Sequence, residues 1–238
     1  MIILFVMTLI VLPAYLNHTL RFAGPLFNIL MQAAALGTAR HFLLTKTTGK
    51  LSVLPYLSLF TNCFLWSYYG LLVEDLSILI ANGSGVLAGL ISTFLFQIYC
   101  SHTPFLEYCA SLSVISLGSM YFAMHEVQMV GYIGCVLSIV LLSSPLATLH
   151  TVIQTKSTNS LPLSTSLASA ASALSWSLYG LLVANDPMIY VPSALGLIPA
   201  ALQLTLYIVY GLPRREKEKE LVRTVDEECK DSKDDFKG

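Results

Sequence analysis

The sequence predicts an all-α membrane protein in which seven transmembrane helices form two parallel three-helix repeats joined by an inverting fourth helix (3+1+3). Three observations lead to this fold class. The chain is 55% hydrophobic and 11% charged, with a mean hydropathy of +0.70, which is too apolar for a soluble domain. One apolar stretch occurs twice, and the basic and acidic residues of the loops fall on opposite sides of the predicted topology.

The repeated stretch contains the only two tryptophans of the chain. Residues 66–73 (WSYYGLLV) return as residues 176–183 (WSLYGLLV), with seven of the eight positions identical at an offset of 110 residues. At the same offset Thr45-Lys46 matches Thr155-Lys156. A match that extends beyond one short motif indicates an internal duplication, and hence two copies of one structural unit.

Seven segments are apolar enough to cross a bilayer, since a span needs about 20 mostly apolar residues whose backbone groups pair within a helix. They cover residues 24–44, 52–73, 77–99, 105–123, 128–151, 162–183 and 187–211. We therefore expect a first repeat over residues 24–100, a linker helix over 101–126 and a second repeat over 127–212. The mixed-charge tail at 213–238 has few apolar residues, which predicts a solvated segment.

Residues 1–23 form an apolar N-terminal segment, which we expect at the extracellular or lumenal end. Its first 16 residues are short for a span and lack a basic start, so a cleaved signal, an extra anchor and an extension of the first helix are all open. We favour a signal-like segment. Asn17 opens the sequon Asn17-His18-Thr19 and is a glycosylation candidate.

The basic residues predict the orientation, because membrane proteins keep lysine and arginine on the cytoplasmic side. One side carries the basic residues of the spans and linkers, Arg40, Lys46, Lys50, Lys156, Arg214 and Arg215, and the other carries Glu74, Asp75, Glu126 and Asp186. The C-terminal tail is therefore expected in the cytosol. Three crossings leave the chain on the wrong side for a second repeat of the same orientation, and the span at 105–123 corrects this.

Several motifs, in their order and spacing, resemble those of the SWEET (MtN3/saliva) family, and its animal branch in particular. They are residues 65–70, 82–85, 144–146 (SPL), 154–158 (QTKST) and 175–180 (SWSLYG). The resemblance covers about residues 24–212, and parallel repeats are an established transporter plan. It implies a transporter that lets neutral sugars equilibrate across a membrane, at the plasma membrane first and in the Golgi or another internal membrane second.

The resemblance also implies site residues. In the family a tryptophan pair and an asparagine pair line a central sugar pocket, and Trp66, Trp176 and Asn82 match three of these positions. The fourth position is Ser193, which offers one hydroxyl in place of an amide. The family further places four prolines at helix bends near the cytosolic gate.

Two of those prolines match Pro145 and Pro162 in the second repeat. In the first repeat Ala35 stands opposite Pro145, so that proline is missing, and Pro55 is a candidate for the neighbouring proline, displaced by three residues. Symmetric rocking of the two halves is therefore less assured than in a chain with all four prolines.

Residue chemistry supports a sugar site but leaves other roles open. Aromatic faces suit the C–H patches of a sugar, and amides and hydroxyls suit its hydroxyl groups. The alternatives are an interfacial aromatic belt for Trp66 and Trp176 and a helix–helix hydrogen bond for Asn82. Asn62 and Ser172 lie one turn before the tryptophans on the same face, where pocket lining and plain packing are equally open.

The residues near the outer ends of the spans have two open roles. Tyr69 and Tyr179 are candidates for an outer gate or for belt anchors, and belt anchoring is the simpler role. Asp186 is a candidate for the same gate or for a plain helix cap, of which the cap is simpler.

No carboxylate, lysine or arginine falls at mid-membrane, which predicts a neutral substrate moving down its gradient without a coupling ion. We expect a mono- or disaccharide as substrate, a lipid bilayer as environment, homo-oligomers, and neither nucleic acid, cofactor nor metal as partner. The alternatives are a transporter of another small neutral solute, like the related Pro-Gln-loop proteins, and a seven-helix receptor. A membrane enzyme is not expected, since no nucleophile elbow or phosphate loop is present.

Overall fold

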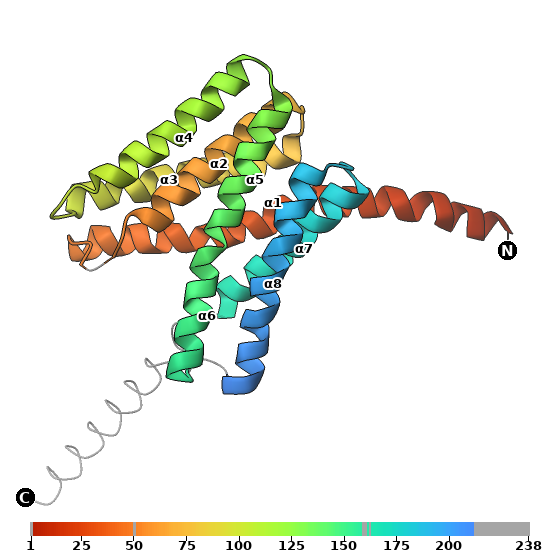
Figure 1. The fold of residues 1–238 in the computed structure, drawn as a ribbon. Helices are drawn as coiled ribbons and strands as arrows, with labels where there is room; N and C mark the ends of the chain where they lie inside the picture. Colours follow the sequence, from red (N-terminus) through yellow and green to blue (C-terminus); the bar gives the residue numbers. More distant parts are fainter. Residues whose placement is uncertain (1, 50, 159–160, 162, 212–238) are drawn as a thin grey trace, which may run out of the picture.

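The computed structural model describes residues 2–49, 51–158, 161 and 163–211, and its regular structure over these ranges is helical. The charged tail and Pro162 lie outside the described residues. Eight helices follow one another along the chain (Figure 1): α1 (Ile2–Thr45), α2 (Leu54–Leu72), α3 (Leu76–Tyr99), α4 (Phe105–Ala123), α5 (Val127–Leu141), α6 (Ser143–Thr155), α7 (Leu163–Leu182) and α8 (Pro187–Tyr210).

The first helix is longer than expected. α1 runs without a break through the boundary that we placed at residue 24, so the described part of the N-terminal segment is helical and continuous with the first span. Gly24 and Pro25 lie inside it. A proline removes only one backbone donor, and membrane helices tolerate this where neighbouring helices pack against them.

The span expected at residues 128–151 is two helices, α5 and α6, joined at Leu142. Pro145 explains the interruption, since it has no N–H to donate to the carbonyl of Leu141 four residues earlier. The Leu142 N–H bonds the carbonyl of Ile139 at 3.1 Å, which is a tighter turn than that of an α-helix. The seven predicted crossings therefore correspond to eight helical segments.

Both repeats have the same internal arrangement. In the first, α3 packs against both α1 and α2; in the second, α8 packs against α7 on one side and α5 and α6 on the other. The repeats meet where α1 packs on α7 and α2 packs on α5, and α4 rests on α2 and α5. Figure 1 shows the two repeats together near the α2–α3 and α7–α8 turns and diverging away from them.

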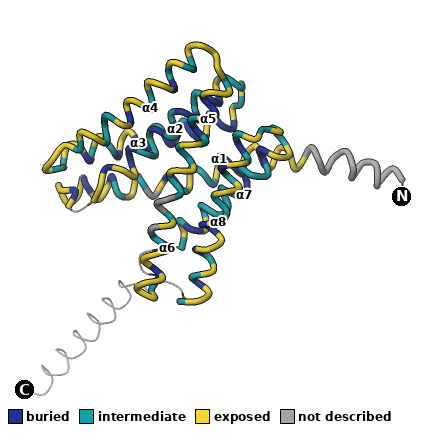
Figure 2. Tube along the Cα trace, in the orientation of Figure 1, coloured by how far each residue is buried: buried dark blue, intermediate teal, exposed yellow. Residues whose placement is uncertain are grey.

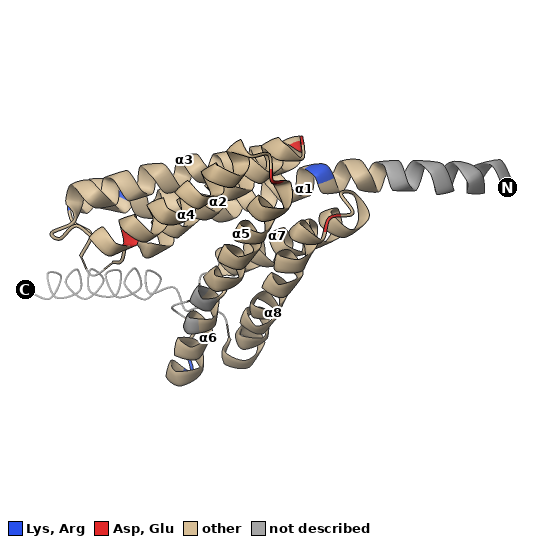
Figure 3. Cartoon of the chain, turned by 45° about the horizontal axis from the view of Figure 1, so that its top comes forward, with Lys and Arg blue, Asp and Glu red and all other residues tan. Residues whose placement is uncertain are grey.

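Equivalent turns have equivalent backbones. Lys46 and Lys156, which end α1 and α6, both adopt a positive φ, of 56° and 51°. Asp75 and Asp186 cap α3 and α8 through side-chain oxygens that accept backbone N–H groups. The charged residues lie mainly at helix ends and turns (Figure 3).

Small residues let α3 approach α2 closely. A Cβ built on Gly89 would lie 2.7 Å from the backbone nitrogen of Phe60, and one built on Gly85 would lie 2.3 Å from the sulfur of Cys63. Helices in lipid gain much of their association energy from such close packing. Gly85 and Gly89 have the small-xxx-small spacing that favours close helix contact, and both lie at such a contact here.

By length and hydropathy alone, four described stretches are able to cross a bilayer: Tyr15–Thr45, Leu76–Tyr99, Phe105–Ala123 and Pro187–Tyr210. The break at Leu142 shortens α5 to 15 residues. α4 is the least enclosed of the four, since only Ser111 and Gly118 are buried and its other residues are exposed or partly exposed (Figure 2). This exposure is what lipid contact requires.

A candidate binding cavity between the two repeats

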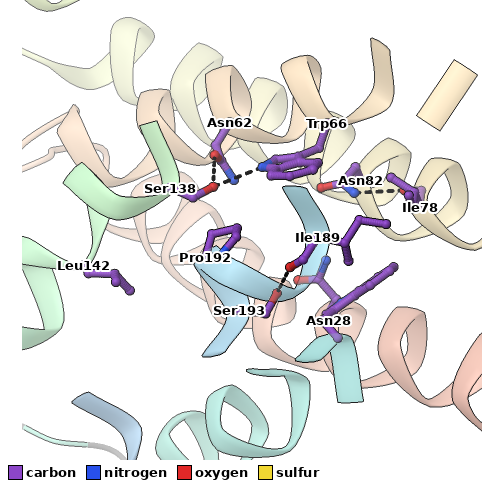
Figure 4. A pocket seen from close by; sticks show the side chains of 11 residues that line it. Asn28, Asn62, Trp66, Ile78, Asn82, Ser138, Leu142, Ile189, Pro192 and Ser193 are labelled. Carbon is purple, nitrogen blue, oxygen red and sulfur yellow. Dashed lines mark hydrogen bonds between the residues drawn. The ribbon is translucent and has the colours of Figure 1, made fainter. Parts of the chain in front are cut away.

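A cavity of about 170 Å³ lies where the two repeats meet (Figure 4). Six helices contribute residues to the cavity. These residues include two tryptophans and several short polar side chains. Its lining consists of Asn28, Asn62, Trp66, Ile78, Asn82, Ser138, Leu142, Trp176, Ile189, Pro192 and Ser193. None of these side chains is ionisable, so the cavity offers hydrogen bonds and apolar contact without a net charge.

Most of the lining consists of pairs that the duplication makes equivalent. Trp66 pairs with Trp176 and Asn28 with Ser138, each at an offset of 110 residues. After the α2–α3 and α7–α8 turns the offset is 111, which pairs Ile78 with Ile189 and Asn82 with Ser193. The cavity therefore lies on the pseudo-symmetry axis of the repeats.

Trp66 is held by hydrogen bonds that cross between the repeats. Its indole Nε1 donates to the Ser138 hydroxyl at 3.0 Å, and Ser138 donates in turn to Asn62 Oδ1 at 2.9 Å (Figure 4). Gly134 of α5 leaves room for the ring, since a Cβ there would lie 3.2 Å from it. Trp66 is 9% exposed, which contradicts a belt position at the lipid surface.

The Trp176 ring also lies against a glycine of the opposite repeat. A Cβ on Gly24 of α1 would lie 3.0 Å from its ring. Each tryptophan also meets the tyrosine three residues later edge to face, with ring centroids 5.4 Å apart for Trp66–Tyr69 and 5.5 Å for Trp176–Tyr179. Each indole thus packs closely against a glycine of the opposite repeat.

Asn82 and Ser193 both bond back to their own helices. Asn82 Nδ2 donates to the carbonyl of Ile78 at 2.9 Å, and the Ser193 hydroxyl donates to the carbonyl of Ile189 at 2.7 Å. The asparagine keeps a second N–H and its carbonyl oxygen, whereas the serine keeps only acceptor capacity.

Two hydrogen bonds join the repeats near the α2–α3 and α7–α8 turns. The Tyr69 hydroxyl donates to Asp186 Oδ2 at 2.5 Å, and the Tyr179 hydroxyl donates to Asp75 Oδ2. Both tyrosines are buried, so the preferred belt role is wrong for them: their rings pack in the core and their hydroxyls reach across to the other repeat. Asp186 both caps α8 and accepts the hydrogen bond of Tyr69.

The hinge candidates occupy different structural positions. Pro145 lies in the first turn of α6, directly after the interruption at Leu142. Pro55 is exposed and lies in the first turn of α2, where a proline costs no intrahelical hydrogen bond. The carbonyl of Ala35, opposite Pro145, accepts a hydrogen bond from Ser92 at 3.2 Å. Asn17 is exposed on α1, where its side chain accepts from Arg21.

Sequence reasoning missed two polar lining residues, Asn28 and Ser138. The duplication could have found them, because they are equivalent to each other and lie one repeat apart. Ser172, predicted together with Asn62, is buried but does not line the cavity, whereas Asn62 does.

A lipid-exposed bundle of two parallel repeats, with a small uncharged cavity at their interface, has the plan of a membrane transporter. The family model described as "Sugar efflux transporter for intercellular exchange" matches this chain twice, over residues 18–104 and 128–215. The two matches cover the two repeats and leave out the whole of α4. The chain belongs to the SWEET (MtN3/saliva) family.

Curated relatives and a solved structure agree with this membership. The sugar transporter SWEET1 of Rattus norvegicus is 31% identical over 207 residues, covering 84% of this chain and 93% of the relative. The bidirectional sugar transporter SWEET3b of Oryza sativa subsp. japonica is 31% identical over 224 residues, covering 85% and 88%. A eukaryotic SWEET transporter solved at 3.7 Å superposes with a TM-score of 0.72 at 30% identity, covering 84% of this chain and 98% of that chain.

Proposed function

We propose that this protein is a facilitative transporter of neutral sugars that works by alternating access. The observation that carries the proposal is the cavity on the repeat axis, in which two indole rings lie among amide and hydroxyl groups. Indole faces suit the C–H surfaces of a sugar ring, and the short polar side chains suit its hydroxyls. The curated relatives that match along most of their length are named as sugar transporters.

The lining supports transport without ion coupling. None of the cavity residues is ionisable, and Glu107 lies at the start of α4, away from the cavity. A proton- or cation-coupled transporter normally needs an ionisable group on the pathway. Movement of the sugar in either direction would then follow its concentration gradient alone.

The size of the cavity supports a monosaccharide as the substrate. Its volume of about 170 Å³ is below the range of roughly 300–1,000 Å³ that is typical of sites for drug-sized ligands. We therefore expect glucose or another hexose to be carried in preference to a disaccharide.

The conformation supports a closed outer gate. The bonds of Tyr69 with Asp186 and of Tyr179 with Asp75 join the repeats at the end that carries the acidic turns. At the opposite end α6 packs on α5 and α8, and the repeats diverge (Figure 1). We assign the diverging end, which carries Lys46 and Lys156, to the cytosol, and place the tail there.

We expect the protein at the plasma membrane first, and we expect it to form homo-oligomers.

Uptake of radiolabelled glucose by cells that lack their own hexose transporters tests the proposal, with the proton gradient collapsed. We expect saturable uptake that exceeds uptake by cells without the protein and that unlabelled sucrose inhibits weakly. Surface-displayed protein that carries no hexose would contradict a sugar substrate. Uptake that stops when the proton gradient is collapsed would contradict the uncoupled mechanism.

A further inference from the structure

The polar residues around the cavity differ systematically between the two repeats. Three equivalent pairs are Asn28 with Ser138, Asn62 with Ser172, and Asn82 with Ser193. In each pair the first repeat carries asparagine and the second carries serine. Five of the six residues line the cavity, and Ser172 does not. The two walls of the cavity therefore differ in chemistry although their backbones are equivalent.

The amides of the first repeat have free hydrogen-bonding groups. Asn62 uses its carbonyl oxygen to accept from Ser138 and keeps both N–H donors, and Asn82 keeps one N–H and its oxygen. Asn28 takes part in none of the hydrogen bonds among the described residues, and its side chain lies with the other lining groups in Figure 4. Its oxygen and both of its N–H donors are open to a ligand.

The hydroxyls of the second repeat donate their protons within the protein. Ser138 donates to Asn62 and accepts from Trp66, and Ser193 donates to the carbonyl of Ile189. A hydroxyl has one proton, so these two serines have only lone pairs left for a ligand. Side-chain amide donors to a bound solute can therefore come only from the first repeat.

We propose that Asn28 is a further substrate-binding residue and that the amides of the first repeat bind the sugar hydroxyls. The inference rests on the proposed function and names the residues that recognise the substrate. Each sugar hydroxyl both donates and accepts a hydrogen bond, and an amide can satisfy both roles at once. Asn28 thus supplies on α1 the amide that position 193 lacks on α8.

The test is zero-trans influx of D-glucose into proteoliposomes that contain the purified full chain. Asn28→Ser places in the first repeat the residue that the second repeat carries at the equivalent position. We expect it to raise the KM for glucose about tenfold, the effect of losing one or two ligand hydrogen bonds, with little change in Vmax. Asn17→Ser makes the same exchange earlier on α1, outside the cavity, and should leave the KM unchanged.

A second variant moves the amide to the other wall. In Asn28→Ser/Ser193→Asn the number of amides is restored, and we expect the KM to return most of the way to the wild-type value. Ser193→Asn alone should lower the KM, and it decides the question if Asn28→Ser does not give monodisperse protein. An unchanged KM in whichever of these variants folds overturns the inference.

Two kinds of negative result are distinguishable. If the wild type carries glucose and Asn28→Ser has a normal KM, the inference is wrong and the proposed function stands. If the wild type neither carries glucose nor is stabilised against thermal unfolding by it or by other hexoses, the proposed function is wrong and the inference falls with it.

Discussion

The two tryptophans are equivalent in the repeat but differ in their hydrogen bonds. Trp66 donates to Ser138, while Trp176 has no hydrogen bond among the described residues and contributes its ring to the cavity. Of the two tryptophans, Trp176 is therefore the one whose removal leaves no hydrogen-bond partner unpaired.

We expect Trp176→Ala to abolish sugar uptake while leaving expression normal. The substitution removes the aromatic face that we propose contacts the sugar, and it enlarges the cavity without leaving a buried polar partner unpaired. Uptake and surface expression should be measured together. Full uptake by the mutant would show that the Trp176 ring does not bind the sugar.

The tyrosine–aspartate pairs predict a second residue-level effect. Tyr69→Phe and Tyr179→Phe each remove one phenol–carboxylate hydrogen bond, a type of bond to a charged group that contributes about 1.5–3 kcal/mol. The buried ring remains in each case, so the fold should persist while the outer end opens more often.

The opening can be measured by labelling a single cysteine placed at Ser138, inside the cavity, with an impermeant thiol reagent added from outside. Labelling should be faster in either phenylalanine variant than in the parent and fastest when both are combined. Equal labelling rates in all four proteins would mean that these bonds do not hold the outer end closed.

At the scale of the helices, α3 depends on glycines that face α2. Gly89→Ala would bring a Cβ to 2.7 Å from the backbone of Phe60, which cannot rotate away, and overpacking of this kind typically costs about 1–3 kcal/mol. Gly83→Ala is the matched control on the same helix, since a Cβ there meets nothing within 4 Å. We expect Gly89→Ala to lower the thermal unfolding temperature in detergent and Gly83→Ala to leave it unchanged or raise it.

The interruption between α5 and α6 predicts a hinge in the second repeat. Pro145→Ala restores an N–H that can bond the carbonyl of Leu141, so α5 and α6 should merge into one straighter helix. Vmax for transport should fall several-fold while the KM changes little, because the cavity residues remain. Zero-trans influx in proteoliposomes measures both quantities.

Pro55→Ala is the comparison that separates the two hinge candidates. Pro55 is exposed in the first turn of α2, and its replacement restores no hydrogen bond within the helix. Transport should therefore stay near the wild-type level. Equal loss in both variants would mean that the interruption at Leu142 is not what makes Pro145 important.

In the first repeat, hydrogen bonds of one buried side chain join α1 to α3, and such bonds oppose bending of α1. Gln32 is buried in α1, where it donates to the carbonyl of Ala81 at 3.2 Å and accepts from Ser84 at 2.7 Å. The equivalent position in the second repeat is Leu142, at the interruption itself. Hydrogen bonds thus join α1 to α3 in the first repeat, at the position where the equivalent helix of the second repeat is interrupted. This difference is expected if the second repeat bends more than the first during transport.

At the scale of the whole molecule, the orientation makes a prediction of its own. A cysteine at Asn185, in the α7–α8 turn, should react with an impermeant reagent on intact cells that display the protein. A cysteine at Lys156, in the turn after α6, should react only after permeabilisation. Both would be placed in a variant without the five native cysteines. The reverse pattern would invert the topology.

The sequence alone determined the repeat, the helical class and much of the cavity. Two tryptophans at one offset, and apolar segments of sufficient length, predict two parallel repeats without any contact being known. The family match over residues 18–104 and 128–215 and the structural match confirm this fold class. Trp66, Trp176, Asn82, Ser193 and Asn62 were predicted, and all of them line the cavity.

Only the tertiary structure decided which polar residues face one another. Asn28 lies on α1, which packs against both α3 and α7, and it lines the cavity; Ser172 does not line the cavity although its repeat partner Asn62 does. The bond of Tyr69 with Asp186 joins residues 117 positions apart. Local pattern and composition report which segments enter the membrane, but the direction of each side chain depends on packing between helices that are distant in the sequence.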